Sequence, residues 1–277
     1  MNLARLFAAL QRIVPQHTLS RLVGRLAASE NPAVRLPLVR AFARAYGVNL
    51  AEAERSDLAA YRSFNDFFTR ALRPGARPID PDPTSVVSPA DGAVSQSGTI
   101  SDGQMLQAKG IRYAFAELVD VCARPSFEGG AFATVYLSPS DYHRVHLPVA
   151  GRLVRSVAIP GKLFSVNAAT EREVPGLFAV NERLVLEFET ELGRMLVVLV
   201  GAMIVASIET VWGGPPSPYR HKQVQTHDLP FEKGAEIGRF LLGSTVIVAF
   251  EQGRVRLDDA LVPGAVVRMG QKIGRAS

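Results

Sequence analysis

Residues 195–208 have the sequence MLVVLVGAMIVASI and form the longest stretch of the chain without a charged side chain. The stretch is fourteen residues long, whereas a helix needs roughly 20 apolar residues to span a membrane. Gly201 interrupts it, and its many valines favour a β strand. The stretch therefore predicts a strand buried in a protein core and argues against a membrane-spanning helix at this point.

Similar short runs recur on both sides of this stretch. They are rich in Val, Ile and Phe and are separated by Gly, Pro, Asn and Asp, which is typical of strands joined by turns. The connections TELG at 190–193 and EQG at 251–253 are typical of hairpins, so we expect a largely antiparallel sheet. The predicted strands cover 132–138, 151–159, 183–189, 194–209, 245–250 and 254–257.

The beginning of the chain has a helical pattern instead. Apolar residues recur every three or four positions among arginines, which predicts amphipathic helices. Residues 1–50 hold seven arginines against one acidic residue, a local charge of +6 in a chain with a total of +5. The three apolar stripes are Leu3, Leu6, Phe7, Leu10, Ile13 and Val14; Leu19, Leu22, Val23 and Leu26; and Leu38, Val39, Phe42 and Tyr46.

Two interpretations of these helices stay open on the pattern alone. Their apolar faces either pack on a core or dip into lipid beneath a collar of arginines. Residues 73–83, RPGARPIDPDP, contain four prolines and a glycine and so cannot continue a helix. We therefore expect an α+β protein with a helical region at 1–79 and a β-rich domain at 80–277.

The cysteine count and the N-terminus indicate the compartment. The single cysteine, Cys122, excludes an internal disulfide and any zinc site built on paired cysteines, and it suits a reducing compartment. The N-terminus lacks a continuous apolar segment followed by a small-residue cleavage site, so we expect no secretory signal. The chain is therefore expected to stay inside the cell.

Three segments of the β-rich part carry polar residues in turn-like positions. SPADG at 88–92 is either a turn whose aspartate caps its own backbone or a site that uses Asp91. SPSDYHRVH at 138–146 places His143 and His146 three residues apart. This suits general acid–base chemistry or a solvated turn better than a metal site, because no third ligand is near. GKLFSVN at 161–167 is a glycine-led loop that lines a pocket or only connects two elements.

A fourth segment, FLLGSTVIV at 240–248, interrupts an apolar run with small polar residues. It is either a β-bulge at Gly243 whose neighbouring hydroxyls bond the backbone, or the place of a reactive Ser244. Asp91, His143 or His146, and Ser244 together supply an acid, a base and a hydroxyl, the groups that activate a serine. Loops gather at one end of a sheet, which favours their meeting.

These segments resemble the phosphatidylserine decarboxylase proenzyme family, in its bacterial, membrane-associated and pyruvoyl-dependent type. The resemblance covers most of the chain, and the LGST processing motif at 242–245 is intact. Ala206 is one mild departure, at a position where we expect the family often to have glycine. The matching segments are FNDFFTR at 64–70, SPADG at 88–92, DYHRVH at 141–146, GKLFSVN at 161–167, VGAMIV at 200–205, ETVW at 209–212, and KGAEIGRF at 233–240 running into LGST.

The resemblance implies an enzyme that makes its own cofactor by cutting its chain between Gly243 and Ser244. Ser244 would attack the carbonyl of Gly243, and elimination and hydrolysis would leave a pyruvoyl group, derived from Ser244, on a small chain, 244–277. The large chain would be 1–243. Asp91, His146 and Ser244 would match the family's charge relay for this cleavage, with His146 as the base and Asp91 fixing its tautomer.

The resemblance also implies the second reaction and its setting. Phosphatidylserine would form a Schiff base with the pyruvoyl group at Ser244 and lose carbon dioxide to give phosphatidylethanolamine, with His143 as the candidate proton donor. No metal, pyridoxal phosphate or nucleic acid is expected. The enzyme would sit peripherally on the cytoplasmic side of the cell membrane, attracted to anionic lipid through the helical region 1–79, which favours the second interpretation of the helices. Its two fragments would form a heterodimer, with further dimerisation left open.

Two other classes of protein share some of these features. A serine lipid hydrolase would also use Ser244, His146 and Asp91, but α/β-hydrolases carry the nucleophile in GxSxG between a strand and a helix. Here LGSTV leads into further strand. A lipoyl-like carrier barrel would draw on the glycine turns at 262–264 and 270–274, but the chain lacks a lysine flanked by methionines at a hairpin tip.

Overall fold

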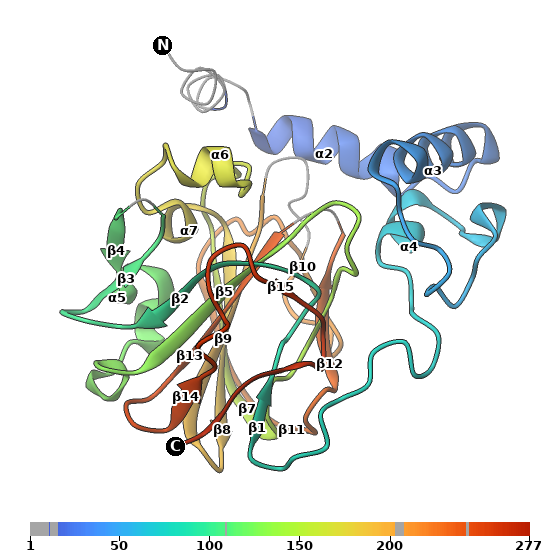
Figure 1. Ribbon diagram of the computed structural model, residues 1–277. Helices are drawn as coiled ribbons and strands as arrows, with labels where there is room; N and C mark the ends of the chain where they lie inside the picture. Colours follow the sequence, from blue (N-terminus) through green and yellow to red (C-terminus); the bar gives the residue numbers. More distant parts are fainter. Residues whose placement is uncertain (1–10, 12–15, 109, 203–207, 242–243) are drawn as a thin grey trace.

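The computed structural model describes residue 11 and residues 16–108, 110–202, 208–241 and 244–277. Helices come first and a β-rich, antiparallel part follows, as Figure 1 shows, so the predicted α+β class is confirmed. The first apolar stripe, from Leu3 to Val14, lies outside the described residues. The second and third stripes lie in α2 (Gln16–Ala27) and α3 (Pro32–Tyr46).

Part of the third stripe packs into a core, since Val39 is buried and Phe42 half-buried, whereas Leu38 and Tyr46 are exposed. α3 begins at Asn31, whose side chain accepts a hydrogen bond from the backbone N–H of Ala33 at 2.9 Å, and it ends at Gly47 in the left-handed conformation. Phe42 of α3 contacts the aromatic rings of α4 (Phe64–Phe68), and together they form a small hydrophobic cluster of their own. The core-packing interpretation therefore holds for α3.

The second stripe is left partly open to solvent. Leu22 and Leu26, one turn apart on α2, have 58% and 49% of their surface exposed. Arg21 and Arg25 beside them are exposed as well. Among the helices that the structure describes, none has both the length and the apolar character needed to cross a bilayer.

One eight-stranded sheet organises the β-rich part. Its order is β11-β7-β8-β9-β13-β5-β2-β15, and every neighbouring pair is antiparallel. β13 lies inside the sheet, between β9 and β5. The strands are β2 (Gly92–Thr99), β5 (Ala131–Leu137), β7 (Gly151–Ile159), β8 (Arg183–Thr190), β9 (Gly193–Val200), β11 (Gln223–Phe231), β13 (Ser244–Phe250) and β15 (Val266–Val267).

Both faces of the sheet are buried at β13, whose successive side chains point to opposite sides. Val246 and Val248 of β13 belong to the hydrophobic cluster shared with two three-stranded sheets, β1-β16-β14 and β10-β12-β6. Ile247 and Ala249 belong to the cluster beneath short helices, including α5 and α7. The remaining elements are η1 (Leu58–Ala60), β1 (Ser85–Val87), β3 (Gln104–Leu106), β4 (Arg112–Ala114), α5 (Phe115–Val119), η2 (Asp120–Cys122), η3 (Pro125–Phe127), β6 (Arg144–His146), α6 (Ala168–Glu171), α7 (Leu177–Val180), β10 (Ile208–Thr210), β12 (Glu236–Phe240), β14 (Val255–Leu257) and β16 (Lys272–Ala276).

The long apolar stretch forms a buried strand as far as Val200. β9 is buried from Met195 onward, which confirms the first half of the predicted strand 194–209. Residues 203–207 lie outside the described residues, and Ile208 begins β10 in a different sheet. The predicted hairpin at 190–193 is confirmed, because Thr190 of β8 pairs with Gly193 of β9.

The hairpin predicted at 251–253 is wrong. β14 pairs with β16 rather than with β13. β13 is hydrogen-bonded along its length to β5 on one edge and to β9 on the other. Because backbone donors and acceptors on both edges are already used, β13 has no free edge for β14.

The proline-rich segment 73–83 contains no helix or strand and leads from α4 to β1 (Figure 1). It is not a detached linker, since Arg77 within it is bound to Asp91 of the β-rich part. The division into two domains at residue 80 stays a prediction.

Candidate functional site

The SPADG segment forms the turn between β1 and β2. The Ser88 hydroxyl donates a hydrogen bond to the carbonyl of Ala90 at 2.8 Å, which closes the turn. Gly92 follows because its backbone lies against β5, where a Cβ would collide with the carbonyl oxygen of Tyr136. Asp91 is thereby held at the point where β2 begins.

The carboxylate of Asp91 is 7% exposed and bound to two partners. Its oxygens accept hydrogen bonds from Arg77 Nε at 2.8 and 3.0 Å, and one oxygen also accepts from the backbone N–H of Met269 at 2.9 Å. Arg77 also binds Glu52 at 2.9 Å. These two carboxylates, first of all Asp91, raise the pKa of Arg77 above its usual range.

His146 lies at the end of β6 and is 8% exposed. Its Nδ1 is 2.8 Å from the carbonyl oxygen of Gly234, so Nδ1 carries the proton that makes this bond. Its Nε2 is 3.0 Å from the hydroxyl of Tyr142, from which it accepts a hydrogen bond. Burial lowers the pKa of His146, which favours the neutral, basic imidazole.

The expectation that Asp91 fixes the tautomer of His146 therefore stays a prediction. No hydrogen bond joins these two described side chains, because Asp91 is bound to Arg77 and Met269. The carbonyl of Gly234 occupies the place at Nδ1 that a triad carboxylate would take. The acceptor at this nitrogen is thus a main-chain carbonyl from the segment before β12.

His143 is fully buried and directly precedes β6. Its Nδ1 donates to the carbonyl of Asp141 at 2.9 Å, and its ring lies 3.9 Å from the ring of Phe68, centroid to centroid. Burial lowers its pKa to about 3. Its Nε2 is buried and has no hydrogen-bond partner among the described residues, so a neutral ring nitrogen is left available.

Ser244 begins β13, and its backbone pairs with Leu137 at the end of β5. The segment that follows Leu137 is the one that carries His143 and His146. Gly243, and with it the expected cleavage bond, lies outside the described residues. β13 continues to Phe250, and no helix occurs in residues 251–277, all of which are described. This order does not match the strand–nucleophile–helix arrangement of α/β-hydrolases.

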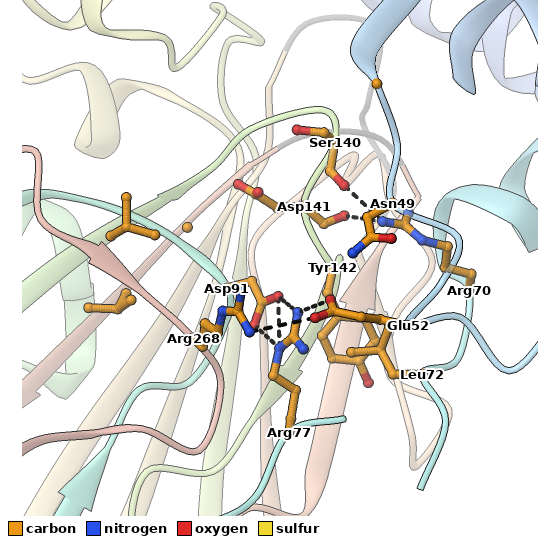
Figure 2. A pocket seen from close by; sticks show the side chains of 14 residues that line it. Asn49, Glu52, Arg70, Leu72, Arg77, Asp91, Ser140, Asp141, Tyr142 and Arg268 are labelled. Atoms are coloured by element: carbon orange, nitrogen blue, oxygen red, sulfur yellow. Dashed lines mark hydrogen bonds and ion pairs between the residues drawn. The ribbon is translucent and has the colours of Figure 1, made fainter. Parts of the chain in front are cut away.

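A cavity of about 240 Å³ opens beside Asp91 and Tyr142 (Figure 2). Three arginines, Arg70, Arg77 and Arg268, line it. Arg70 is 4% exposed, and its Nη2 donates to the carbonyls of Ser140 and Asp141 at 2.8 and 3.3 Å. Its Nε and Nη1 have no partner among the described residues, and no ion pair neutralises it there.

Sequence reasoning missed the side chains that surround Asp91 and His146. Arg77 lies in the segment interpreted only as a linker, and Tyr142 stands between the predicted residues of the DYHRVH motif without being singled out. Arg70 closes the FNDFFTR motif, whose apolar residues predict helix packing but not a buried cation. Arg70 and Tyr142 lie in segments already marked by the resemblance, whereas Arg77 lies between two such segments and no sequence signal singled it out.

The GKLFSVN loop contributes Phe164 and Val166 to the hydrophobic cluster beneath the short helices, whereas Val145, next to His146, belongs to the other cluster. Its Phe164 is held by Asn181, which accepts from the Phe164 N–H at 3.1 Å and donates to its carbonyl at 2.8 Å. In the described part of the chain, no three His, Cys, Asp or Glu side chains gather as a metal site would require.

Comparison with known proteins matches two families and many curated relatives. The family described as phosphatidylserine decarboxylase matches residues 64–275, and one described as PSD matches residues 6–47. A protein of Acinetobacter baumannii (strain AYE) is 53% identical over 270 residues, covering 97% of this chain and 95% of its own. A protein of Azotobacter vinelandii is 53% identical over 282 residues, covering 99% of each. Both are named phosphatidylserine decarboxylase proenzyme. The match spans the helical region, the cavity and β13 alike, and the chain belongs to the phosphatidylserine decarboxylase family.

Proposed function

We propose that this chain decarboxylates phosphatidylserine to phosphatidylethanolamine after cutting itself between Gly243 and Ser244. Relatives that carry the proenzyme name align with the chain almost end to end. The observation that carries the proposal is the pairing of Ser244 with Leu137, because the next segment bears two buried histidines with lowered pKa values. A hydroxyl-bearing residue and two neutral bases are thus supplied by adjacent strand ends.

The cleavage needs no group from outside the chain except water. The Ser244 hydroxyl loses its proton to a base as its oxygen adds to the Gly243 carbonyl carbon. The Gly243–Ser244 amide bond then breaks, so that an ester replaces it and the nitrogen of Ser244 becomes an amine. Loss of the Ser244 α-proton expels the Gly243 carboxylate and leaves dehydroalanine. Water converts this to a pyruvoyl group and ammonia.

His146 is the base that fits the first step. Gly234 holds its Nδ1–H, so the lone pair lies on Nε2, where Tyr142 donates to it. The Tyr142 hydroxyl can relay the proton of Ser244 to His146, or it can rotate away so that the proton passes directly from Ser244 to His146. Asp91 then has one of two roles. It either releases Arg77 and binds His146, or it stays bound to Arg77 and holds that side chain in place. Both roles require the Asp91 carboxylate.

The residues around Ser244 also fit a pyruvoyl group. When formed, its carbonyl would accept the electron pair released as carbon dioxide leaves the substrate. The fit rests on His143, whose Nε2 is buried without a partner among the described residues, as expected of a group that exchanges a proton with substrate. The apolar ring of Phe68 keeps this imidazole neutral by excluding water.

The proposal includes a peripheral place on an anionic membrane. A substrate with two acyl chains stays in the bilayer, so the enzyme must come to it. On α2 the exposed Leu22 and Leu26 lie beside exposed Arg21 and Arg25, an apolar ridge flanked by cations. Anionic lipid attracts such cations by about 1 kcal/mol each close to the surface.

The intact mass of the purified protein tests the proposal. We expect two chains that meet between Gly243 and Ser244, the second with a pyruvoyl end. Ser244→Ala should give one uncut chain, because no hydroxyl can attack. An unmodified protein that stays whole and inactive on phosphatidylserine would overturn the proposal, as would cleavage of the alanine variant at the same bond.

A further inference from the structure

Two glutamines of the N-terminal helical region hold the backbone of the GKLFSVN loop. Gln16 Oε1 accepts a hydrogen bond from the N–H of Leu163 at 2.8 Å, and Gln11 Oε1 accepts from the N–H of Ser165 at 2.7 Å. Gln16 is 7% exposed and Gln11 only 2%. Glutamine is mostly a surface residue, so two buried glutamines aimed at one loop call for a specific explanation.

The other ends of the same side chains are also bound. Gln16 Nε2 donates to the carbonyl of Gln11 at 2.7 Å, and Gln11 Nε2 donates to the Thr170 hydroxyl at 3.3 Å. Each amide therefore uses both its donor and its acceptor. Since a buried polar group left unpaired is costly, the loop N–H groups and the helix amides stabilise each other only when helix and loop are docked.

The opposite side of the loop is bound to the strands next to Ser244. Asn181, fully buried, binds the N–H and the carbonyl of Phe164 and donates to the carbonyl of Gly201 at 2.9 Å. Gly201 directly follows Val200, which pairs with Thr245 of β13. One continuous series of hydrogen bonds thus runs from the helix, through the loop and Asn181, to the strand ends beside Ser244.

The loop is also fitted closely to the 180–182 segment. The backbone N–H of Lys162 donates to the carbonyl of Val180 at 2.9 Å, and the Lys162 carbonyl accepts from the N–H of Glu182 at 2.8 Å. A Cβ on Gly161 would lie 2.5 Å from the carbonyl carbon of Asn181, so any side chain there would push the two segments apart. A shift in the position of the loop must therefore displace Asn181 and Gly201 as well.

We propose that Gln11 and Gln16 are positioning residues that couple docking of the N-terminal helical region, including α2, to the geometry around Ser244. The inference rests on the proposed function, because it takes Ser244 as the reacting position. α2 also carries the exposed ridge of Leu22 and Leu26. Whatever stabilises the docked helix, including a lipid surface, therefore stabilises the ordered loop as well, and the reverse holds by linkage.

The test compares the double variant Gln11→Met/Gln16→Met with Gln225→Met. Methionine keeps the length and flexibility of glutamine but makes no comparable hydrogen bond. Gln225 is exposed on β11 and serves as the matched control. Turnover is measured on a short-chain phosphatidylserine dispersed as monomers and on vesicles containing long-chain phosphatidylserine, per mole of pyruvoyl end counted by mass spectrometry.

We expect kcat of the double variant to fall by roughly tenfold or more on both substrates, since the two hydrogen bonds to the loop and the two that orient the glutamine amides are all lost. The control should stay within about twofold on both substrates. If kcat on the monomeric substrate is unchanged and only KM on vesicles rises, the glutamines merely tether the helix and the inference is wrong.

A single-site series keeps the inference testable if the double variant folds poorly. Gln11→Glu retains an acceptor for Ser165 N–H, and the Thr170 hydroxyl can turn to donate to it. Gln11→Met retains neither contact. We expect the glutamate variant to keep most of the kcat that the methionine variant loses, and equal losses in the two would refute the coupling. Failure of the proposed function would be seen separately, as an uncut unmodified chain.

Discussion

His143 and His146 are three residues apart, yet they are shielded from water by different parts of the molecule. The ring of His143 lies against Phe68 of the helical region, whereas His146 is bound by Tyr142 and Gly234. Burial lowers the pKa of both. Near neutral pH both rings are thus uncharged, and the neutral imidazole is the form that His146 needs as a base.

The two histidines should separate under mutation. His146→Ala and Asp91→Ala should slow self-cleavage by roughly a hundredfold or more, since a general base contributes about 10²–10⁴. The His143→Ala protein should still be cleaved, because the cleavage uses His146 as its base. The cleaved variant should decarboxylate its substrate slowly, because it lacks the proposed proton donor. Gel analysis of cleavage over time, followed by assay of the cleaved protein, distinguishes these outcomes. Normal cleavage of His146→Ala with blocked cleavage of His143→Ala would reverse the two roles.

Burial of His143 also predicts a sensitivity of folding to acid. Below its usual pKa of about 6.5 the unfolded chain binds a proton at this residue, whereas the folded chain does not until about pH 3. The unfolded state therefore binds more protons, and the free energy of unfolding falls by about 1.4 kcal/mol per pH unit as pH drops through this window.

Urea unfolding of the uncut Ser244→Ala protein between pH 6.5 and 4.5 measures this slope. Adding His143→Gln removes the titrating ring, so the slope should become shallower by about 1.4 kcal/mol per pH unit. Equal slopes with and without His143 would show that its ring is protonated in the folded protein.

At the scale of elements, the amphipathic pattern is used in two ways. Val39 and Phe42 of α3 enter the aromatic cluster with α4, whereas Leu38 and Tyr46 of α3, like Leu22 and Leu26 of α2, are exposed to solvent. The spacing of apolar residues is the same in the two segments, so what each residue of a stripe meets depends on the elements packed against its helix. Only the neighbours in space, and not the spacing, decide which stripe is free to touch lipid.

Leu22→Gln/Leu26→Gln should weaken binding to vesicles that contain phosphatidylserine by about tenfold or more, because burying a leucine side chain is worth about 1.5–3 kcal/mol. Self-cleavage should persist, since both side chains are exposed and neither takes part in the hydrogen bonds of Gln11 and Gln16. Val262→Gln, at a position 53% exposed outside the helices, is the control. Co-sedimentation measures binding. Binding equal to that of the unmodified protein would exclude α2 as a lipid contact.

Deleting residues 1–28 is a poorer test of the same point. It would remove the ridge, but it would also remove Gln11 and Gln16 and leave the N–H groups of Leu163 and Ser165 without acceptors. A loss of activity in that truncation would therefore combine a membrane effect with a loop effect. Point substitutions separate the two.

At the scale of the whole molecule, the expected cut falls at the start of an internal strand. β13 would belong to the small chain, yet both of its neighbours, β5 and β9, belong to the large chain. β15 and β16 of the small chain pair with β2 and β1 of the large one. The two chains share one hydrophobic core, so cutting the backbone at 243–244 removes no strand pairing.

The fragments 1–243 and 244–277 should therefore stay together in native buffer. They should elute as one species in size-exclusion chromatography and separate only in denaturant, because release would break strand pairing on both edges of β13 and expose its buried side chains. Native mass spectrometry gives the same readout. Loss of the small chain without denaturant would contradict the shared core.

The sequence by itself determined the elements whose signal is local. Alternating and continuous apolar runs marked β5, β7, β8, β13 and the first half of the long stretch, and the turn at 190–193 followed from its composition. Ser244, His143, His146 and Asp91 stood out because each lies in a motif with polar residues in a turn-like interruption. Local patterns suffice to predict these elements, since the order of apolar and polar residues along a segment indicates whether one or both of its faces are buried.

The tertiary structure alone decided which partners those residues meet. Asp91 is bound by Arg77 and not by His146, β14 joins β16 and not β13, and Gln16 binds Leu163 from 147 positions away. Each choice depends on which strand edges and polar groups remain unpaired after the rest of the chain has packed. The spacing of residues along the chain does not predict these pairings, because they depend on contacts between segments that are distant in sequence.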